Sequence, residues 1–158
     1  MIKAGDRIPE FTFTRMTDKG PAPIGTQDVF GGKKVVFFAV PGAFTPTCSK
    51  QHLPGYVANA EAIRARGIDT IVCLAVNDVF VMDAWGKAQN VGDKVLMLAD
   101  GNAEFTKKLG LELDATKSGM GTRSRRFSMV VEDGIVEELN VESPGEFKVS
   151  SAESTCHL

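Results

Sequence analysis

The sequence has few of the residues that would build a disulfide framework or a metal site. Its 158 residues include three cysteines and two histidines, and no cysteines form a Cys-x-x-Cys pair. Secreted disulfide-rich domains carry even sets of cysteines, and a structural zinc site needs about four Cys or His ligands. We therefore expect free thiols and no metal, and no haem or flavin motif is present either. A lone thiol in a distinctive local sequence is then a candidate nucleophile.

Blocks of one charge and long apolar runs are also missing. The net charge of −2 is spread along the chain, whereas a nucleic-acid footprint needs a basic stripe. No stretch approaches the ~20 apolar residues of a membrane helix, and the opening residues Met1–Asp6 show no secretory signal. We expect a cytoplasmic protein that binds neither nucleic acid nor membranes. Its length fits one domain over residues 1–158.

Continuous apolar runs rich in β-formers predict strands that are buried on both faces. The hairpin signal Glu132-Asp133-Gly134 joins the last two of them. The predicted strands are Lys34–Val40, Ile71–Val76, Val95–Leu98, Phe127–Val131 and Ile135–Val141.

Amphipathic segments between these strands predict helices. Gly67 and Gly110 are stop signals, and Pro54-Gly55 should kink or interrupt the first helix. The predicted helices are Thr47–Arg66, Asp78–Gln89, Asn102–Leu109 and a short terminal one from Ser150 or Ser151 to Leu158. The order indicates an α/β protein with a thioredoxin-like layout, in which a central mixed sheet is flanked by helices.

Cys48 lies where a strand gives way to a helix. The strand ends at Val40, and Thr45 precedes Pro46 as an N-cap precedes a first helical residue. Cys48 then falls at the third helical position, where free amides and the helix dipole favour a thiolate. The alternative is an inert, small apolar side chain, but the polar run Ser49–His52 that follows does not suit an all-apolar helix.

His52 and Cys48 share a helix face at positions i and i+4. This spacing allows a protease-like Cys/His pair, but no group that would orient the imidazole is evident. A hydrogen-bonded structural histidine is the favoured interpretation.

The run Pro41–Gly55 resembles the active-site signature of the peroxiredoxins, specifically the type II or type 5 subfamily in its bacterial or plant branch. The stretches Ile2–Pro9, Val76–Gly86 and Arg126–Val136 are also similar to that subfamily. The resemblance therefore covers essentially the whole chain. It implies a thiol peroxidase that reduces hydrogen peroxide and organic hydroperoxides, and that serves antioxidant defence and redox homeostasis.

The resemblance also implies roles for individual residues. Cys48 would be the peroxidatic nucleophile that is oxidised to a sulfenic acid, Thr45 would contact peroxide and thiolate, and Pro41 would shield the site. Arg126 would complete it, because a guanidinium stabilises a thiolate and can bind peroxide oxygens. Arg123 and Arg125 also precede the Phe127 strand, and we expect these two to be solvated loop charges.

The sulfenic acid must be returned to a thiol. Cys73, in the middle of an apolar strand, is either a core thiol or, as in plant-type members, a resolving cysteine. Cys156 departs from the subfamily pattern, so the resolving role is not assigned to it. The resemblance implies glutathione with glutaredoxin as the reductant, or alternatively thioredoxin, and a homodimer.

Two other functions stay open. One is a thioredoxin-like disulfide exchanger, which the missing Cys-x-x-Cys disfavours, and the other is a non-enzymatic redox sensor. Four aromatic residues could surround the site mouth, pack in the core or form a dimer contact, namely Phe44, Phe80, Trp85 and Phe127.

Overall fold

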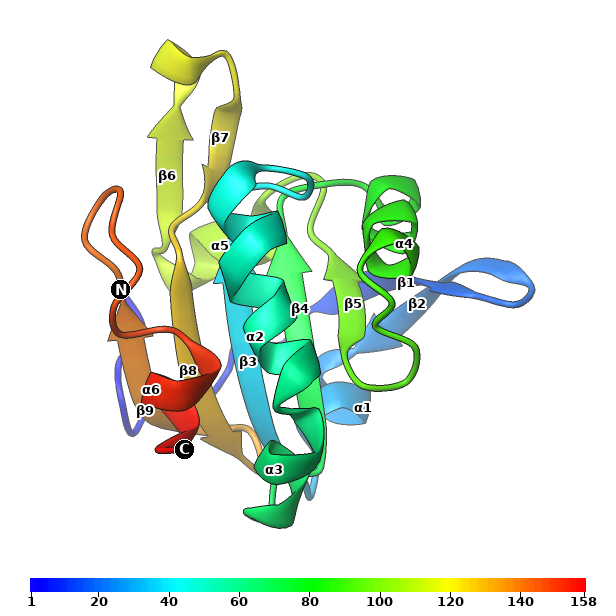
Figure 1. Cartoon of the computed structure of the whole chain (residues 1–158), viewed down its shortest axis with the longest axis vertical. Helices are drawn as coiled ribbons and strands as arrows, with labels where there is room; N and C mark the ends of the chain where they lie inside the picture. The colour runs from blue at the N-terminus through cyan, green and yellow to red at the C-terminus, as the bar shows by residue number, and fades with distance from the viewer.

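A computed structural model describes all of residues 1–158. Its centre is a seven-stranded sheet with the order β2-β1-β5-β4-β3-β8-β9 (Figure 1). The strands are β1 (Thr12–Thr17), β2 (Gly20–Gly25), β3 (Lys34–Val40), β4 (Thr70–Ala75), β5 (Leu96–Ala99), β8 (Phe127–Glu132) and β9 (Ile135–Val141). β3, β4 and β5 run parallel, while β8 and β9 form an antiparallel hairpin at one side. The predicted thioredoxin-like mixed sheet is confirmed.

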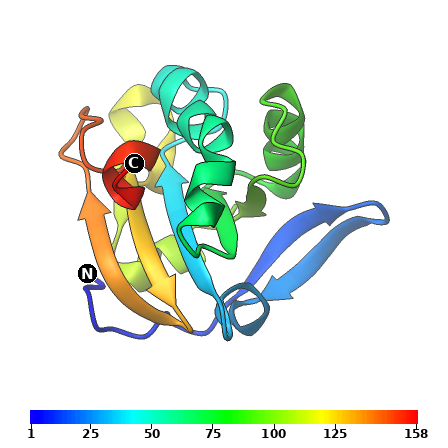
Figure 2. The same cartoon turned by 60° about the horizontal axis from the view of Figure 1, so that its bottom comes forward.

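Helices cover both faces of this sheet (Figures 1 and 2). They are α1 (Thr26–Phe30), a π-helical turn η1 (Cys48–His52), α2 (Leu53–Ala58), α3 (Ala60–Ala65), α4 (Val79–Ala88), α5 (Glu104–Leu109), a 3-10 turn η2 (Thr116–Ser118) and α6 (Ala152–Cys156). A small hairpin of β6 (Glu112–Ala115) and β7 (Gly121–Ser124) stands apart from the main sheet. No helix is long and apolar enough to span a bilayer.

Alternate residues of the parallel strands feed two separate cores, as a period of two requires. On one face, Val36, Phe38 and Cys73 pack with η1, α2, α3 and α4. On the other face, Val35 and Phe37 pack with α1 and α5. Cys48 belongs to the first core, so the candidate nucleophile lies on the α2 side of the sheet.

Pro54-Gly55, where the sequence predicts a kink or an interruption, lies just after a change of helix type from the π-helical turn η1 to α2, and the helical run itself does not stop there. Pro54 lies at the start of α2, and the break falls at Asn59, which has φ −101° and ψ 9°. The preceding η1 turn is π-helical, and in it the Leu53 amide reaches back to the Cys48 carbonyl. Such a wide turn accommodates a residue that lacks an amide hydrogen, so Pro54 continues the helical run.

Candidate active site

Cys48 occupies the predicted position at the start of a helix. Helical backbone begins at Pro46, so Cys48 is the third residue of the run. The Thr45 carbonyl accepts the first i+4 hydrogen bond from the Ser49 amide at 2.9 Å. The Cys48 side chain is fully buried and its thiol is free. The candidate nucleophile therefore lies beneath the surface rather than on it.

The Arg126 side chain contacts the Cys48 sulfur from a different element of the fold. It comes directly before β8, and its Nη2 donates to Cys48 Sγ at 3.1 Å. Its Nη1 donates to His52 Nδ1 at 2.8 Å. A planar guanidinium can serve both acceptors at once. The two hydrogen bonds thus fix one cation against the thiol.

His52 acts on the arginine and not on the sulfur. Its Nε2 lies 3.0 Å from the Ser150 carbonyl oxygen, which can only accept, so the ring hydrogen is assigned to Nε2 and Nδ1 is left bare for Arg126. Burial, followed by the nearby charge of Arg126, lowers the pKa of His52 to about 3. A neutral imidazole in this orientation accepts a hydrogen bond from Arg126 through Nδ1 and so holds the guanidinium in place. The protease-like pairing with Cys48 is wrong, because both ring nitrogens have other partners.

The predicted solvated role of Arg123 is also wrong. Its Nε donates to the Met120 carbonyl and its Nη1 to the Val76 carbonyl, both at 2.9 Å. Arg123 therefore ties β7 to the end of β4. Arg125 lies half-buried at the rim of the cavity described below.

The Thr45 hydroxyl does not cap the helix, contrary to its predicted N-cap bond. It donates to the Gly42 carbonyl at 2.6 Å. A hydroxyl has one hydrogen to donate and two lone pairs to accept with. Because the hydrogen is used within the turn, the hydroxyl can only accept from a further group. The O–H of a hydroperoxide is such a donor.

This geometry gives a prediction for Thr45. Thr45→Val keeps the shape of the side chain but removes the acceptor, so we expect the second-order rate constant for peroxide reduction to fall by about a hundredfold. Thr45→Ser retains the hydroxyl and should keep most of the rate. Stopped-flow measurement of Cys48 oxidation checks both variants. Equal rates for the valine and serine variants would show that the hydroxyl does not bind peroxide.

Pro41 lines a cavity that the Arg126 side chain shares. Thr47 and the segment 142–146 form further walls of this cavity, whose volume is about 140 Å³. Leu113, from the β6–β7 hairpin, also lines it. The family resemblance indicated Pro41 and Arg126 but not the other walls, since nothing local places Leu113 or the 142–146 segment beside them.

The four candidate aromatic residues divide into two pairs. Phe44 and Phe80 are 56% and 63% exposed, whereas Trp85 and Phe127 are fully buried. Trp85 Nε1 donates to Ser49 Oγ at 3.0 Å and so anchors the η1 turn. Phe44 has a φ of +64°, a strained value for a residue with a side chain.

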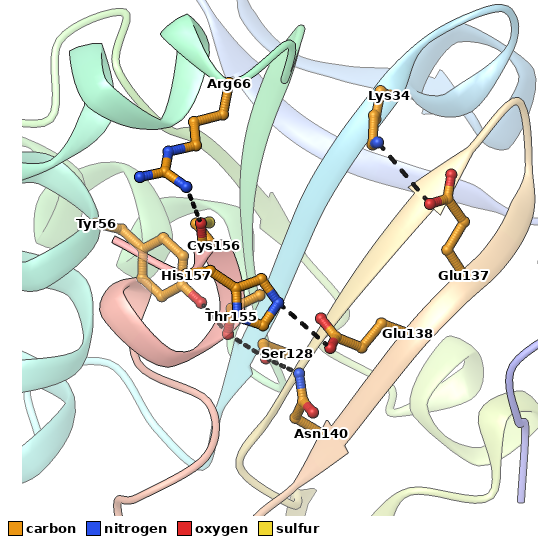
Figure 3. A network of polar contacts seen from close by, with 10 residues as sticks. All are labelled: Lys34, Tyr56, Arg66, Ser128, Glu137, Glu138, Asn140, Thr155, Cys156 and His157. Atoms are coloured by element: carbon orange, nitrogen blue, oxygen red, sulfur yellow. Dashed lines mark hydrogen bonds and ion pairs between the residues drawn. The ribbon is translucent and has the colours of Figure 1, made fainter.

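Neither of the other two thiols is activated. Cys73 is fully buried in β4, and burial, reinforced by Cys48, raises its pKa well above the ordinary value. Burial also raises the pKa of Cys156 to about 11. Figure 3 shows Cys156 at the end of α6, where Arg66 donates to its backbone carbonyl at 3.5 Å. A thiolate at either position is unfavourable at neutral pH.

The site contains no group of three or more His, Cys, Asp or Glu side chains that could hold a metal ion. It does contain a buried thiol with a guanidinium on its sulfur at 3.1 Å, at the start of a helical run that Thr45 precedes. On a thioredoxin-like sheet this combination defines a thiol-based redox enzyme.

Comparisons with known proteins agree with that class. The Redoxin family model matches residues 3–155. The chain is 48% identical to chloroplastic peroxiredoxin-2E of Arabidopsis thaliana over 96% of its own length and 67% of the relative's. It is 47% identical to peroxiredoxin-2C of the same plant, with 96% and 94% covered. The reduced Prx3 of Vibrio vulnificus, solved in complex with H2O2, matches with a TM-score of 0.94 and 51% identity over 98% of this chain and 96% of that one.

The chain therefore belongs to the peroxiredoxin family, in its type II/type 5 subfamily, and is a peroxidase.

Proposed function

We propose that this peroxiredoxin reduces hydrogen peroxide and organic hydroperoxides with Cys48 as the attacking thiolate. The sulfur attacks one peroxide oxygen, the O–O bond breaks, and the other oxygen leaves with a proton as water or an alcohol. Cys48 becomes a sulfenic acid. The observation that carries this proposal is the 3.1 Å hydrogen bond from Arg126 Nη2 to the Cys48 sulfur.

Two groups would stabilise the developing negative charge, and a third would orient the peroxide. Arg126 faces the sulfur and can also donate to the leaving oxygen as negative charge gathers there. The amides of Thr47 and Cys48 lie in the first helical turn, where no intrahelical acceptor is available. The Thr45 hydroxyl accepts from the peroxide O–H and so orients it. Hydrogen peroxide as a substrate is supported by the Vibrio vulnificus relative, which was solved with that molecule.

We further propose that an outside thiol, glutathione with glutaredoxin or else thioredoxin, regenerates Cys48. That thiol would condense with the sulfenic acid to a mixed disulfide and release water, and a second thiol would then reduce the disulfide. The decisive experiment follows steady-state peroxide consumption with each donor system in turn. Many turnovers with one donor support the proposal. A single stoichiometric oxidation with both donors would favour the redox sensor, and rapid insulin reduction would favour the disulfide exchanger.

Cys73 gives a separate prediction. Because it is buried in the middle of β4 with a raised pKa, we expect Cys73→Ser to retain donor-supported turnover. Intact mass after one equivalent of peroxide should show an added oxygen on Cys48 in both proteins. A loss of two hydrogens in the wild type that disappears in Cys73→Ser would instead identify Cys73 as the resolving cysteine.

We also propose a homodimer that forms through a face containing Phe44 and Phe80. Both side chains are more than half exposed, and both are linked to α4, since Phe80 lies on it and the Phe44 ring is 6.5 Å from that of Trp85. Exposed apolar side chains that gather in one patch mark interfaces. Phe80→Glu should therefore shift the protein to a monomer in light scattering at micromolar concentration. Leu158→Glu, at an exposed apolar residue of the C-terminus, is the matched control. A wild-type protein that is already monomeric would contradict the proposal.

A further inference from the structure

Glu142 is a buried carboxylate that the chemistry above does not use. It is 4% exposed, and no lysine or arginine side chain pairs with it. Its carboxylate instead accepts from the amides of Lys148, Val149 and Ser150 at 2.8–2.9 Å and from the Ser150 hydroxyl at 2.7 Å. Successive amides that converge on one anion form a strong, charge-assisted site.

These hydrogen bonds outweigh the cost of burying the charge. Burial by itself raises the pKa of Glu142, but the bonds from Lys148, Ser150 and Val149 hold that pKa below its usual value. The side chain is therefore ionised at neutral pH. Its hydrogen bonds close the segment 142–150 into a loop that has no helix or strand of its own between β9 and α6.

The closed loop contacts the Arg126–His52 pair at three points. The Glu142 amide donates to the Arg126 carbonyl at 2.9 Å. The Ser150 carbonyl accepts from His52 Nε2 at 3.0 Å and from Tyr56 Oη at 2.8 Å. The Phe147 ring centre lies 5.0 Å from that of His52 and 5.9 Å from the Arg126 guanidinium carbon. The same loop supplies one wall of the cavity at Pro41.

We propose that Glu142 is a positioning residue for the peroxidase reaction. By gathering the amides of residues 148–150, it holds the Ser150 carbonyl and the Phe147 ring against His52 and so keeps the guanidinium of Arg126 on the Cys48 sulfur. The inference rests on the roles proposed above for Cys48 and Arg126. Without the carboxylate, the amides of residues 148–150 lose their acceptor, and only Tyr56 and His52 still hold the Ser150 carbonyl. His52 can then adopt its other tautomer, in which Nδ1–H opposes Arg126 instead of accepting from it.

The test compares Glu142→Gln with Glu138→Gln, which removes the same charge from β9 away from the site. We expect Glu142→Gln to lower the second-order rate constant for peroxide about tenfold, since small misplacements of reacting groups carry large rate penalties. The control should keep the wild-type rate. Glu142→Ala removes both acceptor oxygens and should lower this rate constant further. If the alanine variant does not fold, the rate of the glutamine variant alone tests the proposal. Wild-type rates in Glu142→Gln would overturn the proposal.

Two further measurements separate positioning from a general loss of structure. In an Arg126→Ala background, Glu142→Gln should cause no additional loss, because its effect passes through Arg126. In ¹⁵N spectra of histidine, which this chain contains only twice, His52 should change from the Nε2–H tautomer to a mixture. An equal loss of rate in both backgrounds, with an unchanged His52 tautomer, would reduce Glu142 to a purely structural residue. A fully active Cys48→Ser protein would instead refute the proposed function itself.

Discussion

Cys48→Ser should abolish peroxide consumption, with a loss of at least about 10⁴-fold in rate. A serine hydroxyl would have the same neighbours, including Arg126 Nη2, which donates to the sulfur at 3.1 Å. However, a hydroxyl is not ionised at neutral pH, and no base in the site can take its proton, because both nitrogens of His52 are occupied. The first-order disappearance of peroxide under excess protein is the measurement.

The same assay on Cys156→Ser provides the control. Its thiol has a pKa raised to about 11 and lies on α6, so removal should leave the rate at the wild-type value. If Cys48→Ser still reduced peroxide and only the double variant with Cys156→Ser did not, Cys156 on α6 would be the nucleophile and the proposed site would be refuted.

Arg126→Ala should cause the second-largest loss, about 10²- to 10³-fold in the second-order rate constant. The change removes the one cation that contacts the sulfur and leaves His52 Nδ1 without its donor. Arg126→Lys should recover only part of this loss. An ammonium is a point charge that cannot present the planar pair of donors that reaches Cys48 and His52 together.

Stopped-flow measurement of Cys48 oxidation checks that the rate falls from the wild type to Arg126→Lys and again to Arg126→Ala. Arg15→Ala, on β1, is the control for the loss of one positive charge and should behave as the wild type. If Arg126→Lys reacted as fast as the wild type, a positive charge alone would be sufficient and the pair of donors would not contribute to the rate.

The sequence predicted those parts of the fold whose signals are local. Lys34–Val40 is a continuous apolar run because β3 lies between two cores, and its bounds are confirmed without change. The hairpin of β8 and β9 follows from Glu132-Asp133-Gly134, where Gly134 has the positive φ of +80° that such a turn needs. The helix start at Pro46 likewise depends on neighbouring residues only.

The parts that escaped prediction depend on distant partners. β2 contains Pro21 and Pro23, which argue against a strand, and it is tolerated only because it lies at the edge of the sheet. β6 and β7 are four residues each and too short to show a period.

The same limit applies to the site. Cys48 and Thr45 belong to one local motif, and the resemblance supplied Arg126. His52 and Ser150 are 98 residues apart in sequence, and no local pattern indicates that the imidazole is held by that carbonyl. The role of Glu142 could not be predicted from the sequence either, because most of its partners are backbone amides, which every residue except proline provides.

The neutral state of His52 has a consequence for the protein in acid. Its pKa is about 3 when buried and near 6.5 when free, so between these values the unfolded chain binds a proton that the folded chain refuses. Acidification through that range therefore favours the unfolded state, and the stability present above pH 6.5 is lost progressively as pH falls toward 3. Acidification would thus lower the free energy of unfolding over a pH range in which His52 of the folded protein is still neutral.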